Sequence, residues 1–322
     1  MTKVVLPAAE LPIADALQLV EARLASLVQS RESLLTDIST YLICAGGKRV
    51  RPAVTIFIYR ACGGSELRDI VDVAAALELI HSATLLHDDI IDGSEIRRGQ
   101  DSAFRKYGLA NTLVTGDFVF SRAFQLCARF EEKLINWAAE ACISLTEGEV
   151  MQGRFRHNPA VTLDDYFEII SRKTASIFQQ GARTAADLAG AADGTVEAMA
   201  ACGYNVGMTF QIIDDLLDVA GSEAHFGKPI GIDLRDGNPS LPVVLALRRD
   251  PEIGRIFEKS EPTPGEINAA LVRIRESGVL SEVRALAAQY GARASENLHA
   301  LPTSADRDHL LQLVDQLIER AA

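Results

Sequence analysis

The sequence predicts an all-α protein, a bundle of ten or more helices around a central cavity. Two observations predict it. Apolar residues recur at three-to-four spacing along most of the chain, and the alternation typical of half-buried strands is scarce. Short breakers containing Gly or Pro separate these segments, without a long linker, a repeat or a low-complexity tract. We therefore expect one helical domain that spans residues 1–322.

The predicted helices follow from this spacing. The clearest cover residues 71–91, 111–130, 134–151, 163–188 and 196–219. Thr162, followed by Asp164 and Asp165, is typical of a helix start, because acidic residues in the first turn favour the helix dipole. Residues 223–239 are rich in Gly, Asp and Lys, so we expect a loop there that acts as a mobile lid.

Composition excludes several classes of protein. The chain has 322 residues and a net charge of −12, which argues against a nucleic-acid partner, since a surface that binds phosphodiester backbones is normally basic. Its five cysteines lie far apart, a spacing that gives neither a disulfide framework nor a zinc site. We expect reduced thiols in a cytoplasmic protein. The first residues do not resemble a signal peptide, and we expect no membrane-spanning helix.

Two aspartate runs of the form D-D-x-x-D, at 88–92 and 214–218, carry the strongest functional signal. On a helix, residues i and i+4 share a face, so Asp88 with Asp92, and Asp214 with Asp218, aim carboxylates the same way. Like charges so placed repel unless a cation lies between them, and paired hard oxygen ligands suit Mg²⁺. A solvated helix face is the alternative for one run, but the second copy favours a metal site.

Basic residues flank this acidic pattern. Lys48, Arg49 and Arg51 follow Gly46-Gly47, and Arg97-Arg98 come shortly after the first aspartate run. Arginine forks and lysine point charges match phosphate oxygens. Carboxylates that hold a cation, together with cations around them, are the two halves of a metal–diphosphate site.

The order of these motifs resembles the trans-polyprenyl diphosphate synthase family. The likeness covers about residues 45–242 and includes Gly46-Gly47-Lys48-Arg49-Val50-Arg51-Pro52, Leu85-Leu86-His87 before the first run, Arg97-Arg98-Gly99 after it, Gly207-Met208-Thr209-Phe210-Gln211 before the second run, Gly227-Lys228-Pro229 and Ser240-Leu241-Pro242. Residues 114–124 resemble the long-chain members, the octaprenyl, decaprenyl and solanesyl diphosphate synthases that make quinone side chains.

The resemblance implies the isoprenoid synthase fold and a prenyltransferase that condenses isopentenyl diphosphate with an allylic diphosphate such as farnesyl or geranyl diphosphate. It implies Mg²⁺ at Asp88, Asp92, Asp214, Asp215 and Asp218, with Asp89 in support. It implies an isopentenyl diphosphate site of Lys48, Arg51, His81 and Arg98, and an allylic diphosphate site of Arg97, Lys173, Thr174, Gln211 and Lys228. The catalytic set is then Asp88, Asp89, Asp92, Arg97, Lys173 and Asp214. The family is typically dimeric, so a homodimer is implied. Because residues 111–130 are rich in large apolar side chains, we expect this helix to form the dimer face, and we expect at most peripheral membrane contact.

Chain length is predicted from the helix that carries the first run. Helical spacing places Thr84 and His81 beneath Asp88, and the resemblance also points to Ala83. Ala83 and Thr84 are small where short-chain members have an aromatic plug, so the growing tail has an open path. Each added unit buries five carbons, worth roughly 4 kcal/mol in a dry tunnel, and we predict an all-trans product of about C40–C50. Close helix packing is the other explanation for small residues here.

Four alternatives stay open. A shorter product, geranylgeranyl or farnesyl diphosphate, is the nearest. A class I terpene cyclase uses the same metal chemistry without an isopentenyl diphosphate site. A di-iron carboxylate bundle would use Glu78-x-x-His81 and Glu296-x-x-His299. A regulatory subunit would usually lack one aspartate run, and both runs are complete here.

Overall fold

The computed structural model of the chain describes residues 13–221 and 230–320, and they form an assembly of helices. In chain order these are α1 (Ala14–Leu27), α2 (Ser33–Cys44), α3 (Val50–Ala61), α4 (Leu67–Ile91), α5 (Ala103–Tyr107), α6 (Leu109–Cys127), α7 (Glu132–Phe155), α8 (Leu163–Ile170), the π-helical turn η2 (Ser171–Ala175), α9 (Ser176–Leu188), α10 (Asp193–Ala220), α12 (Ile232–Asp236), α13 (Leu241–Leu247), α14 (Pro251–Phe257), α15 (Pro264–Glu276), α16 (Val279–Leu298) and α17 (Ala305–Glu319). Two short strands, β1 (Ile96–Arg97) and β2 (Gln100–Asp101), form an antiparallel hairpin. The predicted all-α bundle is confirmed.

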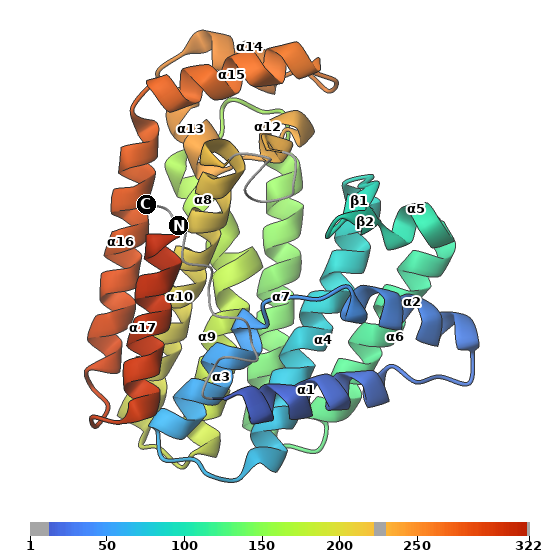
Figure 1. The fold of residues 1–322 in the computed structure, drawn as a ribbon, viewed down its shortest axis with the longest axis vertical. Helices are drawn as coiled ribbons and strands as arrows, with labels where there is room; N and C mark the ends of the chain where they lie inside the picture. Colours follow the sequence, from blue (N-terminus) through green and yellow to red (C-terminus); the bar gives the residue numbers. More distant parts are fainter. Residues whose placement is uncertain (1–12, 222–229, 321–322) are drawn as a thin grey trace.

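The long helices α4 and α10 run through the interior, and shorter helices surround them (Figure 1). One hydrophobic core gathers α1–α4, α6, α9 and α17. A second core gathers α8, α13–α16 and the C-terminal half of α10. Both cores include residues of α10, so this helix joins them. In Figure 1, the ends of α4 and α10 that carry the aspartate runs lie toward the same end of the bundle.

Four of the five predicted helices match single helices, and the fifth is divided. The predicted segment 163–188 is α8 and α9 with η2 between them, because residues 171–175 adopt the wider π-helical hydrogen bonding. Thr162 caps α8 in a capping box with Asp165, as the sequence predicts a helix start there. The π-helical turn shifts the side chains of α9 around the helix axis relative to those of α8, so the two helices do not present the faces of one continuous α-helix.

One local expectation was wrong in part, and one element was not predicted. We expected residues 223–239 to be a loop throughout, but the described part of this segment contains α12, held by hydrogen bonds from Ile232 and Asp233. The basic pair Arg97-Arg98 lies on a hairpin that periodicity did not predict, where Arg98 and Gly99 both have positive φ, 52° and 78°. Two such residues at a two-residue turn match the twist of the strands.

One helix among the described residues, α4, has the length and hydropathy of a membrane-spanning segment, which the sequence reasoning did not expect. However, 78% of its most apolar 18-residue window is buried inside the protein. Burial on all sides explains this composition, because a helix surrounded by a core is apolar around its whole circumference. We therefore regard α4 as the central core helix of the bundle.

Candidate active site

The first aspartate run lies at the C-terminal end of α4. Asp88 and Asp89 belong to its last turn, and the Asp92 N–H donates to the Asp88 carbonyl at 2.8 Å. One helical turn thus separates Asp88 from Asp92 on a shared face, as predicted from their spacing. Asp89 is fully buried, and its Oδ1 accepts a hydrogen bond from Arg97 Nε at 2.8 Å. Asp89 therefore fixes the following hairpin to α4.

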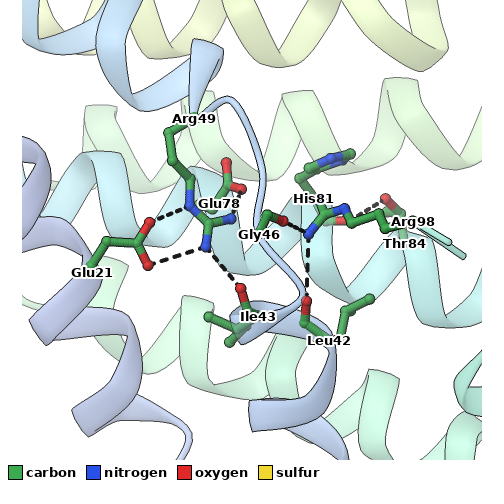
Figure 2. A network of polar contacts seen from close by, with 9 residues as sticks. All are labelled: Glu21, Leu42, Ile43, Gly46, Arg49, Glu78, His81, Thr84 and Arg98. Carbon is green, nitrogen blue, oxygen red and sulfur yellow. Dashed lines mark hydrogen bonds and ion pairs between the residues drawn. The ribbon is translucent and has the colours of Figure 1, made fainter. Parts of the chain in front are cut away.

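The hairpin sends its two arginines to different partners. Arg97 Nη2 lies 2.6 Å from Asp89 Oδ1, beside the first aspartate run. Arg98 instead donates through Nη1 to the carbonyls of Gly46 and Leu42, at the glycine-rich loop (Figure 2). The two guanidinium groups therefore belong to different halves of the site.

A buried arginine holds the glycine-rich loop against α4. Arg49, only 5% exposed, donates from Nη1 to Glu78 Oε1 at 2.6 Å and from Nη2 to the Ile43 carbonyl at 2.9 Å. Its Nε pairs with Glu21 of α1, and Figure 2 shows the guanidinium between the two carboxylates. Arg49 has φ +46°, an uncommon value for a residue with a side chain. The loop that carries Lys48 is thus joined to both α1 and α4.

Arg51 and His81 lie further into this half of the site. The Arg51 guanidinium carbon lies 5.0 Å from the centre of the Phe178 ring and 5.7 Å from that of Phe210, both within cation–π range. Burial lowers the pKa of Arg51, although Glu78 and then Asp214 oppose the shift. Burial, followed by the charges of Arg51 and other nearby arginines, holds the pKa of His81 well below 6.5. His81 is therefore a neutral imidazole at pH 7, able to donate and to accept a hydrogen bond.

The π-helical turn η2 connects the two aspartate runs. Lys173 pairs with Glu149 and donates to Gln152 Oε1 at 2.8 Å, and its positive charge acts on Asp88. The next residue, Thr174, donates from its hydroxyl to Gln211 Oε1 at 2.9 Å on α10. Successive residues of η2 therefore reach the α4 side and the α10 side of the site.

The three aspartates of the second run have different surroundings. Asp214 is exposed. Asp215 is buried and accepts hydrogen bonds from Tyr166 Oη at 2.7 Å, Gln211 Nε2 at 2.8 Å and the Leu241 N–H at 3.0 Å. Asp218 accepts from the Ile232 and Asp233 N–H groups at the start of α12, at 3.1 and 3.2 Å.

These contacts give Asp215 and Asp218 a structural task beside the predicted metal role. Each carboxylate receives backbone N–H groups from the chain that follows α10, so together they tie α12 and α13 to that helix. Burial nevertheless raises the pKa of Asp215 to about 7 and that of Asp218 to about 6. Asp214 is the member of the run whose carboxylate is open to an incoming ligand.

The acidic residues fit a divalent cation that arrives with a diphosphate. Burial raises the pKa of Asp88 to about 6, with Glu149 and Asp92 adding to the rise and Lys173 opposing it. A cation would relieve this excess of negative charge. Across residues 13–221 and 230–320, no three His, Cys, Asp or Glu side chains form a ready-made metal cage. Mg²⁺ does not require one, since it keeps waters and takes phosphate oxygens beside one or two carboxylates.

Most of the predicted site residues lie at the same end of the bundle, but three residues that contact them were not predicted. Lys228 lies outside the described residues. Glu149 and Gln152 were missed although both lie in or next to a predicted helix; as i and i+3 neighbours they face Lys173 together. Arg156 was missed as well, and it forms an ion pair with Asp92, 64 residues away in the sequence. No local pattern in the sequence could have indicated that pair.

The carboxylate–histidine pairs of the di-iron alternative are used differently. Glu78 is paired with Arg49, and Glu296 lies on α16, whose C-cap is His299. Within the described part of the chain no cluster of such ligands forms. The geometry therefore favours the diphosphate site over a di-iron centre.

A narrow apolar cavity lies deeper in the bundle. Its volume is about 30 Å³, and its walls come from α4, α6, α7, α9 and the α6–α7 connection. The lining residues are Val73, Ala76, Leu77, Ile80, Cys127, Phe130, Leu134, Ala138, Gln180 and Thr184. Ile80 and Val73 lie 8 and 15 residues before Asp88, so the cavity is roughly 12–22 Å down α4 from the carboxylates. Ala83 and Thr84 lie between the carboxylates and this cavity.

The fold and this site define an all-α enzyme in which acidic and basic side chains gather at one end of a bundle, above an apolar interior. Residues 32–274 match the family model described as polyprenyl synthetase. The chain belongs to this family, and it is a trans-prenyltransferase that makes polyprenyl diphosphates from isoprenyl diphosphate substrates.

Three relatives illustrate the likeness. A geranylgeranyl diphosphate synthase of Methanosarcina mazei is 36% identical over 297 residues, which cover 90% of this chain and 91% of that protein. The octaprenyl diphosphate synthase of Escherichia coli is 33% identical over 306 residues, 94% of each chain. The crystal structure of a polyprenyl synthase from Caulobacter crescentus, complexed with calcium and isoprenyl diphosphate, has a TM-score of 0.93 at 34% identity and covers 100% of this chain and 99% of its own.

Proposed function

We propose that this protein uses Mg²⁺ to condense isopentenyl diphosphate repeatedly with an allylic primer, farnesyl or geranyl diphosphate, into an all-trans product of about C40–C50 that serves as a quinone side chain. The observation that carries the proposal is the gathering of Asp88, Asp92 and Asp214 with Lys173, Arg97 and Arg51 at one end of the bundle. Carboxylates for a cation and cations for phosphate oxygens are what ionisation of a diphosphate ester requires.

In the proposed reaction, Lys173 and Arg97 hold the allylic diphosphate while its carbon–oxygen bond breaks. Their fixed charges lie where negative charge develops on the leaving group, and Thr174 and Gln211 add polar contacts from η2 and α10. When bound, Mg²⁺ at Asp88, Asp92 and Asp214 supplies Lewis acidity toward the diphosphate oxygens. The resemblance also assigns Lys228, which lies outside the described residues, to the allylic diphosphate.

The isopentenyl diphosphate site is formed by the glycine-rich loop and α4. Lys48, Arg51 and Arg98 bind its diphosphate, and neutral His81 donates a hydrogen bond to it without adding charge. This arrangement holds the double bond next to the allylic cation. The proton lost after carbon–carbon bond formation goes to the departing diphosphate, so the protein supplies no nucleophile.

Two features support a long product. Ala83 and Thr84 are small side chains between the carboxylates and the apolar cavity, and this cavity lies further along the same helix, α4. From Asp88 to Leu67 the helix offers about 31 Å of depth for a hydrocarbon tail. A shorter product, such as geranylgeranyl diphosphate, is the second candidate. Its support is the 36% identity to the Methanosarcina mazei enzyme and the small volume of the cavity.

We further propose a homodimer that acts in the cytoplasm with at most peripheral membrane contact. Large apolar side chains are exposed on α6 and α7, among them Val114, Ile143 and Val150 at 54%, 59% and 61%. Such a set on neighbouring helices is typical of an interface. Light scattering on the purified protein tests the dimer, and a single monomeric mass would contradict it.

The function is tested by incubating the purified protein with Mg²⁺, farnesyl diphosphate and isopentenyl diphosphate, followed by mass analysis of the extracted lipid. We expect a ladder of all-trans products that ends near C40–C50. A single product of geranylgeranyl length would replace the long-chain proposal with the second candidate. Cyclic hydrocarbons without chain growth would contradict prenyl elongation and favour a terpene cyclase.

A further inference from the structure

Arg156 is a cation at the site that none of the roles above uses. It follows α7, and its guanidinium pairs through Nη2 with Asp92 while Nη1 lies 3.4 Å from the Ile91 carbonyl. Both members of the pair are largely buried, with side-chain exposures of 25% for Arg156 and 20% for Asp92. A predicted metal ligand is therefore already neutralised by a side chain of the protein.

The backbone around Arg156 is anchored from the opposite side. The next residue, His157, donates its N–H to the Gly237 carbonyl at 2.9 Å, and its ring Nδ1 lies 3.1 Å from the Phe257 carbonyl. Gly237 packs so closely on the His157 ring that a Cβ would lie 2.2 Å from Nδ1. The main chain beside Arg156 is thus fixed, so the rotatable bonds of the Arg156 side chain are what allow its guanidinium to reach another partner.

The guanidinium also keeps an unused donor. Arg156 Nε is buried and has no hydrogen-bond partner among the described residues. The other cations beside the first aspartate run differ in this respect, because Lys173 is held by Glu149 and Gln152, and Arg97 donates through both Nε and Nη2 to Asp89. Arg156 therefore has donor capacity left for an anion that arrives beside this run.

The Asp92 oxygen that pairs with the Arg156 guanidinium cannot at the same time be a full ligand of a divalent cation. A metal ion that arrives alone must break the ion pair and leave a partly buried arginine without an acceptor, which opposes binding. A metal ion that arrives with a diphosphate brings phosphate oxygens, and an arginine fork binds these well. Because Arg156 gives up Asp92 to the metal ion and gains the diphosphate, binding of the metal ion favours binding of the diphosphate, and the reverse also holds.

We propose that Arg156 is the counter-ion of Asp92 in the substrate-free protein and moves to the diphosphate when the metal binds, so that divalent cation and diphosphate bind cooperatively. This inference rests on the proposed function, since it takes Asp92 as a metal ligand. Arg156 then acts as a positioning residue before substrate arrives and as a substrate-binding residue afterwards.

The test compares the wild type with Arg156→Gln, using Mn²⁺ alone and the Mn²⁺–pyrophosphate complex as two separate probes. Titration of Mn²⁺ followed by electron paramagnetic resonance gives the affinity for the metal alone. Calorimetry at saturating Mn²⁺ gives the affinity for the complex. We expect Arg156→Gln to bind Mn²⁺ alone about fivefold more tightly and the complex about fivefold more weakly, the size of one partly exposed charge pair.

Opposite signs separate this role from a structural one, because damage to the fold would weaken both affinities. Arg154→Gln is the matched control: Arg154 lies two residues earlier on α7, is exposed, and its loss changes the net charge equally. It should match the wild type in both titrations. Arg156→Lys retains the charge, so this variant should bind Mn²⁺ alone as weakly as the wild type does.

Two results would overturn the inference in distinguishable ways. If the wild type binds both probes and Arg156→Gln shows the same affinities, Arg156 has no part in the coupling, and the proposed function stands. If the wild type binds neither probe, the metal assignment of Asp92 fails, and the proposed function fails with it.

Discussion

The Asp88 carboxylate is held at a cost to the stability of the metal-free protein. Its pKa in the folded protein is about 6, above the ordinary 3.8, chiefly because of burial. An acid whose folded pKa is raised favours folding only when protonated, so this carboxylate reduces stability progressively as the pH rises from about 3.8 through 6. Above that window the full penalty applies.

Replacing Asp88 by Asn should therefore stabilise the metal-free protein at pH 7.5 while abolishing turnover. One pKa unit corresponds to about 1.4 kcal/mol, so the free energy of unfolding should rise by on the order of 1–3 kcal/mol. Urea unfolding in the presence of a chelator measures it. At pH 4 the difference between variant and wild type should shrink, and a variant that is less stable than the wild type at pH 7.5 would contradict the argument.

At the scale of single residues, the sequence predicts a role where the type and spacing of the residues suit only a few kinds of ligand. Repeated aspartates at i and i+4 indicate a cation site by their charge and spacing alone, and Asp88, Asp92 and Asp214 occupy such positions. The partners of Asp215 and Asp218 were not predictable. Their hydrogen bonds come from backbone N–H groups at 241 and 232–233, which depend on how the chain returns to α10.

At the scale of elements, the glycine-rich loop depends on one buried ion pair. Arg49→Met leaves Glu78, 3% exposed, without its guanidinium, and breaking a buried pair typically costs about 3–5 kcal/mol. We expect a loss of that order in the free energy of unfolding, and a higher KM for isopentenyl diphosphate, because Lys48 and Arg51 flank Arg49.

The double variant Arg49→Met/Glu78→Met is the control for this pair. It removes both charges, so much of the stability should return. Denaturant unfolding of the single and double variants gives the coupling energy. If the double variant is as unstable as the sum of the two single variants, the two side chains do not depend on each other.

The π-helical turn η2 packs closely on α7 at Gly148, where α7 has no side chain. A Cβ at Gly148 would lie 2.6 Å from the Lys173 backbone nitrogen and 3.0 Å from Arg172 Cβ. Gly148→Ala should therefore push η2 away, destabilise the protein by about 1–3 kcal/mol and lower kcat/KM for the allylic substrate through Lys173 and Thr174.

Gly153→Ala on the same helix is the matched control, because nothing lies within 4 Å of its added Cβ. It should be neutral or slightly stabilising, since alanine favours a helix over glycine. Steady-state kinetics and thermal unfolding of both variants decide the matter. Equal behaviour of the two would show that α7 and η2 tolerate more space between them.

Secondary-structure elements were predicted well where a stripe of apolar residues determines the structure. They were predicted poorly where local hydrogen bonding determines it. The stripe of 163–188 continues across η2, so periodicity cannot reveal that five of its residues adopt π-helical hydrogen bonds. The hairpin at 96–101 is too short to show alternation, and Gly99 in its two-residue turn, Arg98-Gly99, was its only local signal in the sequence.

At the scale of the molecule, product length should follow from the width of the path along α4. Thr84→Phe and Ala83→Phe place an aromatic ring between the carboxylates and the cavity, so both should shift the product distribution to shorter chains. Thr84→Val keeps the shape of the side chain and should leave the distribution unchanged. Mass analysis of extracted lipids gives the result, and an unchanged ladder in both phenylalanine variants would rule out this path.

The overall architecture was predictable as an all-α bundle because helical periodicity recurs along the chain. Its assembly was not, because the contacts that define the site join distant segments: Arg156 with Asp92, Arg49 with Glu21 and Glu78, and Arg98 with the carbonyls of the glycine-rich loop. Such pairs are selected by packing in three dimensions. A single sequence contains the residues but not their distances.

The burial of α4 also has a consequence for biosynthesis. This helix packs closely on α9, where a Cβ at Gly181 would lie 2.6 Å from Leu77 Cδ1, yet α9 ends 97 residues after α4. Ribosomes add about 5–20 residues per second, so the part of α4 that packs on α9 lacks this neighbour for roughly 5–20 s during synthesis, although α1 and α3 precede α4 in the chain and α6 follows it closely. The surface of α4 that waits for α9 is therefore the part of this apolar helix that stays uncovered longest as the chain is made.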